Sequence, residues 1–107
     1  MEHLSALDLA AWLADPSRPQ PFLLDVREQW EFDTCHVDGA VLMPMNSIPA
    51  RIDDLDEDAA IVCICHHGAR SMQVARFLVS NGFAEVANIA GGIDAWSLQL
   101  DPTVARY

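Results

Sequence analysis

The chain has 107 residues, 51% of them hydrophobic, so it has enough apolar surface for one modest core, and we expect a single domain over 1–107. Sixteen acidic residues against six arginines give a formal net charge of −10, which argues against nucleic acid and anionic membranes as partners. No apolar run approaches the roughly 20 residues that cross a bilayer, and 1–15 lack the basic start and apolar centre of a signal peptide, so we expect a cytoplasmic protein.

The first quarter of the chain predicts a helix followed by a buried strand. Ser5 followed by Asp8 resembles a capping box, and the apolar residues that follow recur on one helix face, which predicts a helix over 6–14. Three prolines then exclude regular structure. The apolar run Phe22–Leu24 comes next and is typical of a strand buried on both faces.

The second quarter predicts two helices around a short strand. Residues 28–34 have a polar helical pattern in which Trp30 offers a hydrophobic anchor. Residues 40–43 form a short apolar run that predicts another strand. A helix over 48–55 is expected next, capped by the Asn or Ser that precedes it, and the acidic residues beyond it are expected to be solvated.

The second half predicts two strand–helix pairs, a strand over 61–64 with a helix over 70–81, and a strand over 86–89 with a helix over 93–98. Short apolar strands that alternate with helices predict parallel βαβ units. We therefore expect an α/β fold with an open, mostly parallel sheet of about five strands and helices on both faces. Functional sites in such folds gather at the carboxyl ends of the strands.

The loop that follows the strand over 61–64 is the most informative segment of the chain. It reads Cys65-His66-His67-Gly68-Ala69-Arg70-Ser71. The N–H groups at a helix start have no internal partners, and together with the helix dipole they favour an anion. A thiolate is such an anion, and cysteines in these positions ionise readily. Cys65 is therefore the candidate nucleophile.

The other two cysteines do not predict a disulfide framework. Cys63 would share a strand face with Cys65 at a spacing that discourages a mutual disulfide, and an odd number of cysteines suits a reducing compartment. Cys63 is expected to pack inside the sheet layers.

Three motifs follow one another along the chain. The first runs from Asp25-Val26-Arg27-Glu28 through Glu31-Phe32 to His36-Val37-Asp38-Gly39-Ala40, the second is Cys65-x-x-Gly68-x-Arg70-Ser71, and the third is Asn88-Ile89-Ala90-Gly91-Gly92-Ile93-Asp94-Ala95-Trp96. The second motif alone would also fit phosphatases. Together, in this order, the three resemble the motifs of single-domain rhodanese-like sulfurtransferases.

The resemblance implies the rhodanese-like fold and a two-step sulfur transfer. Cys65 would take a sulfane sulfur from a donor such as thiosulfate, hold it as a persulfide and pass it to cyanide or a thiol, including the thiol of a sulfur-relay protein. Inward-facing N–H groups of the loop would stabilise both the Cys65 thiolate and the anionic persulfide. The thiolate must also be exposed to attack a sulfur donor. No cofactor is implied. No metal is expected either, because three adjacent residues cannot all turn to one ion.

The substrate is expected to bind to the six residues that follow the nucleophile, His66, His67, Gly68, Ala69, Arg70 and Ser71. Gly68 predicts a tight turn that lets successive amides face the sulfur. Arg70 is expected both to hold an anionic donor and to form a salt bridge. For Ser71, capping the helix is favoured over donation to the sulfur. The two neutral imidazoles would make the mouth of the site less cationic than is usual for the family.

Supporting residues are expected from the first motif. Asp25 and Arg27 would form an ion pair that braces the loop, and Glu31 would accept hydrogen bonds from the same region. Cys35 takes the place where the family usually has a glycine before histidine, so it is either a neutral substitution or a second thiol near the pocket that resolves the Cys65 persulfide as a disulfide. Packing, rather than ligand binding, is expected for the three tryptophans Trp12, Trp30 and Trp96.

Three other functions compete with sulfur transfer. Phosphatases and arsenate reductases also place a reactive cysteine under a loop that ends in arginine, but the cell-cycle phosphatases with this fold have a loop one residue longer. A non-catalytic binding module is the second alternative, although such domains often lack the cysteine that this chain keeps. A redox thiol switch is the third.

Overall fold

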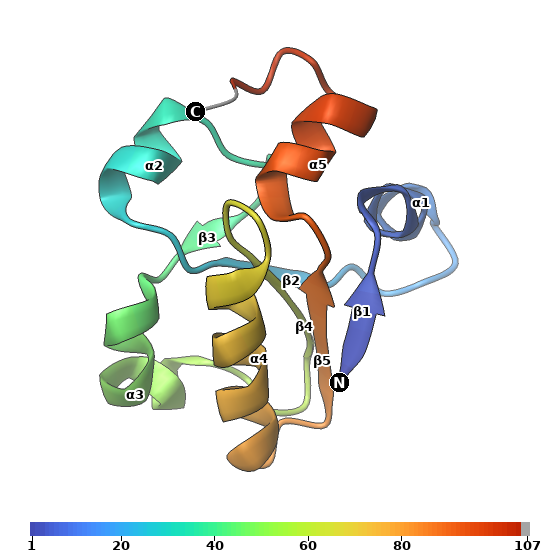
Figure 1. Ribbon diagram of the computed structural model, residues 1–107. Helices are drawn as coiled ribbons and strands as arrows, with labels where there is room; N and C mark the ends of the chain where they lie inside the picture. Colours follow the sequence, from blue (N-terminus) through green and yellow to red (C-terminus); the bar gives the residue numbers. More distant parts are fainter. Residues whose placement is uncertain (106–107) are drawn as a thin grey trace.

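A five-stranded parallel sheet forms the centre of this computed structural model, which describes residues 1–105 (Figure 1). The strand order is β1-β5-β4-β2-β3, and every neighbouring pair is parallel. The strands are β1 (Glu2–Leu4), β2 (Phe22–Asp25), β3 (Val41–Leu42), β4 (Ala60–Ile64) and β5 (Glu85–Ile89). The expected α/β architecture with a parallel sheet is confirmed.

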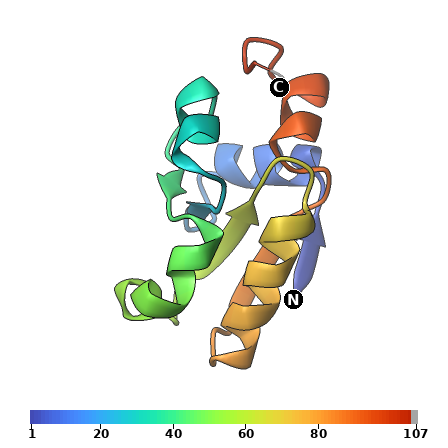
Figure 2. The same cartoon turned by 60° about the vertical axis from the view of Figure 1, so that its left-hand side comes forward.

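Helices cover both faces of the sheet (Figures 1 and 2). They are α1 (Ala6–Ala14), α2 (Gln29–Thr34), α3 (Ile48–Arg51), α4 (Ala69–Ser80) and α5 (Gly92–Gln99), with 3₁₀ turns η1 (Met45–Ser47) and η2 (Ile52–Asp54). The capping box predicted for α1 is present, with Asp8 N–H donating to Ser5 Oγ and Ser5 N–H to Asp8 Oδ2, each at 3.0 Å. No helix in the described part of the chain is both long and apolar enough to span a bilayer.

Two hydrophobic clusters lie on opposite faces of the sheet, because successive strand residues point to opposite sides. Along β4, Ile61 and Cys63 pack beneath α3 and α4, whereas Val62 and Ile64 pack against α1 and α5. Cys65 continues the first series and belongs to the cluster beneath α4. The candidate nucleophile is thus directed to the α4 face by the alternation of the strand before it.

Four details of the fold differ from the sequence predictions. The strand β1 was not predicted, because three residues with two exposed polar side chains carry no strand pattern, yet it pairs with β5 at the sheet edge. The helix over 48–55 is broken at Arg51, whose φ and ψ of −112° and 10° leave the helical region. Neither predicted residue caps it, since Ser47 Oγ donates to the Pro44 carbonyl instead. Trp30 is 62% exposed and does not anchor α2 in the core.

Candidate active site

The site lies at the carboxyl ends of β4, β2 and β5, where the loop between β4 and α4 passes close to the start of α5 (Figure 1). Two N–H groups of the α5 start hold the loop. Ile93 N–H donates to the Cys65 carbonyl at 2.8 Å, and Asp94 N–H donates to the His66 carbonyl at 3.1 Å. A Cβ on Gly92 would overlap both of these carbonyl groups. The approach of α5 therefore needs a glycine at position 92 and fixes the path of the loop.

The sulfur of Cys65 accepts a hydrogen bond from the backbone of the same loop. Gly68 N–H donates to Cys65 Sγ at 3.0 Å. Gly68 has a φ of +106°, in the left-handed region that glycine adopts without steric cost, and it occupies the N-cap position of α4. The tight turn predicted at Gly68 is present, and it aims an amide of the helix start at the sulfur.

Cys65 is 1% exposed, so the prediction of an exposed thiol is wrong. The physical reason is that the side chain points into the cluster beneath α4 while the loop folds over it. A reactant must reach the sulfur through the loop, which restricts attack to small groups or to an opened loop.

Ser71 does not cap α4, contrary to the preferred sequence interpretation, because Gly68 takes the N-cap position without a side-chain bond. The Ser71 side chain is buried inside the turn. Its Oγ lies 3.3 Å from Cys65 Sγ and 3.2 Å from the Gly68 carbonyl oxygen, and it also contacts Asn88 Oδ1. The hydroxyl is thus the second polar group on the sulfur.

Cys63 is a buried thiol that takes no part in this hydrogen bonding. Burial, followed by the charge of Cys65, raises the pKa of Cys63 to about 12. The thiol therefore stays protonated and unreactive at neutral pH. This agrees with the expectation that Cys63 packs inside the sheet layers.

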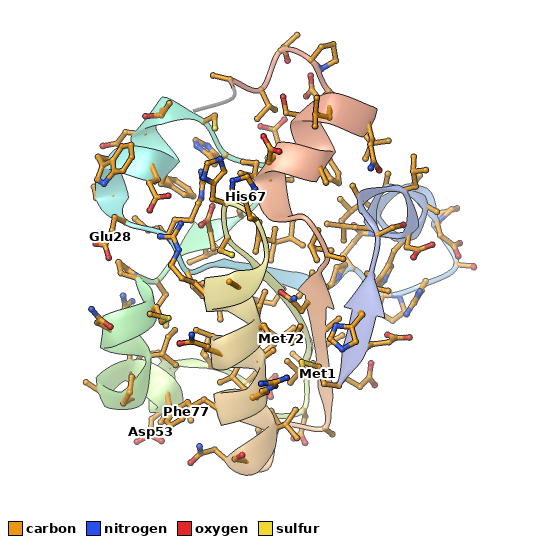
Figure 3. The ribbon with its side chains drawn as sticks, viewed as in Figure 1. Met1, Glu28, Asp53, His67, Met72 and Phe77 are labelled. Carbon is orange, nitrogen blue, oxygen red and sulfur yellow. The ribbon has the colours of Figure 1, made fainter. Side chains whose placement is uncertain are left out.

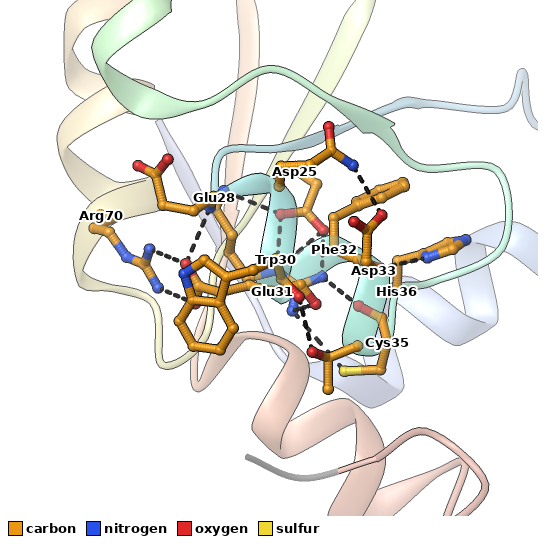
Figure 4. A network of polar contacts seen from close by, with 12 residues as sticks. Asp25, Glu28, Trp30, Glu31, Phe32, Asp33, Cys35, His36 and Arg70 are labelled. Carbon is orange, nitrogen blue, oxygen red and sulfur yellow. Dashed lines mark hydrogen bonds and ion pairs between the residues drawn. The ribbon is translucent and has the colours of Figure 1, made fainter.

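Arg70 and Glu31 form a bidentate ion pair between α4 and α2 (Figure 4). The Nη1–Oε1 distance is 2.6 Å and the Nη2–Oε2 distance is 2.8 Å. Glu31 Oε1 also accepts from Glu28 N–H at 3.0 Å, which closes a capping box at the start of α2. The salt bridge predicted for Arg70 and the acceptor role predicted for Glu31 are both present.

Asp25 and Arg27 form the second ion pair, and both side chains are fully buried. Arg27 Nη2 donates to Asp25 Oδ2 at 2.7 Å and to the Cys35 carbonyl at 2.7 Å, and Nη1 donates to the Glu31 carbonyl at 3.4 Å. The Cys35 carbonyl at the end of α2 thereby gains a donor, and the Glu31 carbonyl, which already accepts from Cys35 N–H at 3.2 Å, gains a second one. Arg27 therefore fixes α2 relative to β2, and α2 in turn carries the Glu31 that holds Arg70 (Figure 4).

The two histidines of the loop stack on each other, with ring centroids 4.0 Å apart. His67 is the outer one, labelled at the top of the loop in Figure 3, and its Nδ1 lies 3.9 Å from Asp94 Oδ2. Burial, followed by the charge of His67, lowers the pKa of His66, against the opposing effects of Asp94 and Glu31. His66 is therefore neutral at pH 7, as expected for the mouth of the site.

Cys35 lies away from the candidate nucleophile. Its side chain packs against the cluster beneath α1 and α5, whereas Cys65 belongs to the cluster beneath α4. The Cys35 sulfur is 3.9 Å from Arg27 Nη1 and lines a cavity of about 390 Å³ with residues such as Trp96 and Val104. Nothing in this geometry favours the resolving role considered for Cys35.

No role was predicted from the sequence for Asn88 and Asp94, which were quoted only as part of the third motif. Asn88 is 1% exposed and its Nδ2 donates to the Gly68 carbonyl at 3.3 Å. A signal for it was present, because Asn88 is a polar residue near the carboxyl end of an otherwise apolar strand, and buried polar groups need partners. Asp94, at the start of α5, has no comparable signal.

Comparison with known proteins gives matches over most of the chain. The family described as Rhodanese-like domain matches residues 5–99. The thiosulfate sulfurtransferase GlpE of Vibrio cholerae is 30% identical over 96 residues, which are 90% of this chain and 91% of that protein. The crystal structure of SSP1007 from Staphylococcus saprophyticus has a TM-score of 0.84 at 30% identity and covers 94% of this chain and 97% of its own.

Other relatives are longer than this chain. An Arabidopsis thaliana protein named Rhodanese-like/PpiC domain-containing protein 12, chloroplastic, is 38% identical over 89 residues, which are 79% of this chain and 30% of that protein. The match to a Bacillus subtilis relative covers 40% of that protein's length. The similarity to these longer proteins is therefore confined to one part of each.

Proposed function

This chain belongs to the rhodanese-like domain family, and on that premise we propose that it is a sulfurtransferase with Cys65 as the nucleophile. The sulfur donor is a small anion such as thiosulfate. The acceptor is a thiophile, either cyanide or a thiol, including the thiol of a sulfur-relay protein. The name of the Vibrio cholerae relative, a thiosulfate sulfurtransferase, supports the choice of donor.

The observation that carries this proposal is the hydrogen bond from Gly68 N–H to Cys65 Sγ at 3.0 Å, with the Ser71 hydroxyl at 3.3 Å on the same sulfur. Donors fixed before the reaction stabilise an anion without reorganisation. The Gly68 N–H is such a fixed donor, and the Ser71 hydroxyl joins it when its proton turns to the sulfur, so both can stabilise the thiolate that attacks and the thiolate that is released. The N-terminal end of α4 adds a favourable dipole.

In the first step, the Cys65 thiolate attacks the outer sulfur of thiosulfate. A new S–S bond forms to Cys65, the S–S bond of thiosulfate breaks, and its electron pair leaves with sulfite. In the second step, cyanide attacks the outer persulfide sulfur, the persulfide bond breaks, and thiocyanate and the Cys65 thiolate are released. The enzyme returns to its starting state with no net redox change and no added cofactor.

The remaining residues of the loop bind and orient the donor in this proposal. Arg70, 32% exposed and held by Glu31, supplies a cation at the edge of the loop for the anionic donor. His66 and His67 form the wall of the mouth, and Ala69 is an exposed position at the start of α4. Asp25 and Arg27 support α2 from inside the molecule.

Thiocyanate release from thiosulfate and cyanide tests the proposal. We expect the natural protein to release thiocyanate and Cys65→Ser to lose this activity completely, because a serine hydroxyl forms no persulfide. Cys63→Ser is the matched control, since its buried thiol is unreactive, and it is expected to keep the activity. Mass spectrometry of the thiosulfate-treated protein should find one extra sulfur on the Cys65 peptide.

Equal rates for the natural protein and Cys65→Ser would refute the assignment. Phosphate release from an aryl phosphate in the absence of sulfur transfer would favour the phosphatase alternative. Absence of both activities, with intact binding to a partner protein, would favour the non-catalytic module.

A further inference from the structure

The buried polar pair Ser71 and Asn88 presents more acceptors than donors around the candidate nucleophile. Ser71 Oγ lies within hydrogen-bonding reach of Cys65 Sγ, the Gly68 carbonyl oxygen and Asn88 Oδ1. A serine hydroxyl has one proton to donate. Both side chains are buried, so the three acceptors compete for this proton with little help from water.

The orientation of the Asn88 amide is set by its second contact. Asn88 Nδ2 donates to the Gly68 carbonyl at 3.3 Å, and Oδ1, which can only accept, then faces Ser71. The Ser71 hydroxyl therefore donates to Asn88, and its lone pairs face Cys65 Sγ. This arrangement suits a neutral thiol, because the S–H group can donate to Ser71 Oγ.

Ionisation of Cys65 changes the preferred direction of the hydroxyl. A thiolate is an acceptor only, and hydrogen bonds to a charged group are stronger than neutral ones. The Ser71 hydroxyl then turns to Sγ, and Asn88 Oδ1 loses its donor inside the protein, which has a cost. The position of the Ser71 proton is thus coupled to the charge on the sulfur.

We propose that Asn88 is a positioning residue that competes with the Cys65 thiolate for the Ser71 proton and so limits how readily the nucleophile ionises. Asn88 acts through Ser71, since its two amide atoms bond to the Ser71 hydroxyl and to the Gly68 carbonyl. The proposal rests on the proposed function for the role of the thiolate, but the competition itself can be measured without any sulfur donor.

Other charged or titratable groups surround the site from each packed element. They are His3 on β1, Cys63 on β4, His66 and His67 on the loop, Arg70 and Arg76 on α4 with Glu31 on α2, and Asp94 on α5. The hydrogen bonds of Ser71 Oγ and the Asn88 amide described above run instead to Cys65, to Gly68 and to each other. Substitutions at 71 and 88 therefore leave the surrounding charges in place. Changes in the ionisation of Cys65 in these variants then show which acceptor receives the Ser71 proton.

The test is the pH profile of Cys65 alkylation by iodoacetamide, resolved by fragment mass from Cys63 and Cys35. Asn88→Ala removes the competing acceptor, so we expect the midpoint of the alkylation profile to fall by about half a pH unit to one pH unit. Below the midpoint this is a threefold to tenfold gain in the thiolate fraction of Cys65. Asn88→Asp places a carboxylate there, which holds the proton more strongly and repels the thiolate, so the midpoint should rise. Ser71→Ala removes the donor to the thiolate and should also raise it.

The double variant Ser71→Ala/Asn88→Ala distinguishes this competition from a structural role. Without the hydroxyl, removal of Asn88 should leave the midpoint at that of Ser71→Ala. A wider opening to the reagent would change the plateau of the profile and leave the midpoint unmoved. Asn81→Ala is the matched control, because Asn81 is exposed at the opposite end of α4, where its side chain donates to the Phe77 carbonyl.

Shifts in the same direction for Asn88→Ala and Asn88→Asp, or a shift at Asn88 that persists in the Ser71→Ala background, would overturn the proposal. If circular dichroism shows that Asn88→Ala does not fold, the test rests on Asn88→Asp and Ser71→Ala, both of which should raise the midpoint of the alkylation profile. Loss of thiocyanate release with these alkylation shifts intact would count against the proposed function alone.

Discussion

At the scale of single residues, Arg70 combines an ion pair with a position at the edge of the loop. Both Nη atoms contact the Glu31 carboxylate, while the Arg70 side chain remains 32% exposed. A guanidinium in a fixed bidentate pair loses little further entropy when it binds an anion. Glu31 thereby orients a cation that would otherwise have many rotamers.

We predict that Arg70→Ala raises the KM for thiosulfate by about tenfold, with a smaller change in kcat, because a charge-assisted contact to the donor is worth on the order of 1.5 kcal/mol. Steady-state thiocyanate release measures both constants. Arg76→Ala, which removes an exposed arginine from the middle of the same helix, is the control. An unchanged KM in Arg70→Ala would assign this residue to structure alone.

His66 gives a prediction on acid stability. Burial, followed by the charge of His67, lowers the pKa of folded His66 below its ordinary value of 6.5. At acid pH the unfolded state therefore binds more protons than the folded state. The contribution of neutral His66 to the free energy of unfolding is fully present above about pH 6.5 and is lost as the pH falls from there toward the lowered pKa of the folded protein.

We therefore expect His66→Gln to show a smaller loss of Tm than the natural protein between about pH 7 and about pH 5. Differential scanning calorimetry at several pH values measures this loss. His3→Gln, a substitution of an exposed histidine on β1, should leave the loss unchanged. An equal loss in His66→Gln and the natural protein would contradict the prediction.

The residues of the loop were predictable from their motif, but their partners were not. Cys65 and Gly68 occupy the positions that the motif predicts, and the paired roles of Asp25 with Arg27 followed from their place at a strand end. The direction of the Ser71 hydroxyl and its contact with Asn88 depend on how α4 packs on β5. A sequence pattern holds no information on such packing.

At the scale of elements, the start of α5 determines the shape of the loop. Gly92, with a φ of +58°, lies so close to the loop that any Cβ would overlap the Cys65 and His66 carbonyl groups. The two carbonyls in turn accept from N–H groups of α5. A helix that is distant in sequence thus supports the loop of the candidate nucleophile.

We predict that Gly92→Ala destabilises the protein by about 3 kcal/mol or more and greatly reduces sulfur transfer, since backbone strain and steric overlap add. Gly39→Ala is the control, because Gly39 has a φ of +84° but a Cβ added there would meet no atom within 4 Å, and we expect it to cost only about 1–2 kcal/mol. Urea unfolding measures both. Similar costs would show that the overlap is relieved by movement of α5.

Long elements were predicted better than short ones. The α1 and α4 helices have strong apolar periodicity and clear ends, and the structure places them within one residue of the predicted bounds. The strand β1 and the broken helix after Ser47 are set by tertiary contacts. Three or four residues carry too little local preference to predict such elements.

At the scale of the whole molecule, the net charge of −10 opposes the approach of an anionic donor. The described residues include one fully buried arginine, Arg27, and two others, Arg51 and Arg70, in ion pairs with acidic side chains. Long-range repulsion between the protein and thiosulfate therefore acts against the local attraction at the loop.

We predict that the KM for thiosulfate falls as the ionic strength rises from about 0.01 M to about 0.15 M, because the Debye length shrinks from about 30 Å to about 8 Å and screens the repulsion. Initial rates in sodium chloride measure the effect. Alkylation by neutral iodoacetamide, at a pH where Cys65 is fully ionised, should not change. A KM that rises with salt would show that local attraction at the loop controls binding.

The support of the loop by α5 has a consequence for biosynthesis. The chain emerges from the ribosome with Cys65 well before residues 91–94, whose N–H groups and glycines shape the turn around the sulfur. Until residues 91–94 dock on the sheet, the Cys65 and His66 carbonyls lack the two N–H donors that hold the loop. We therefore expect the loop that buries Cys65 to take its final shape late in folding, after α5 has packed on the sheet.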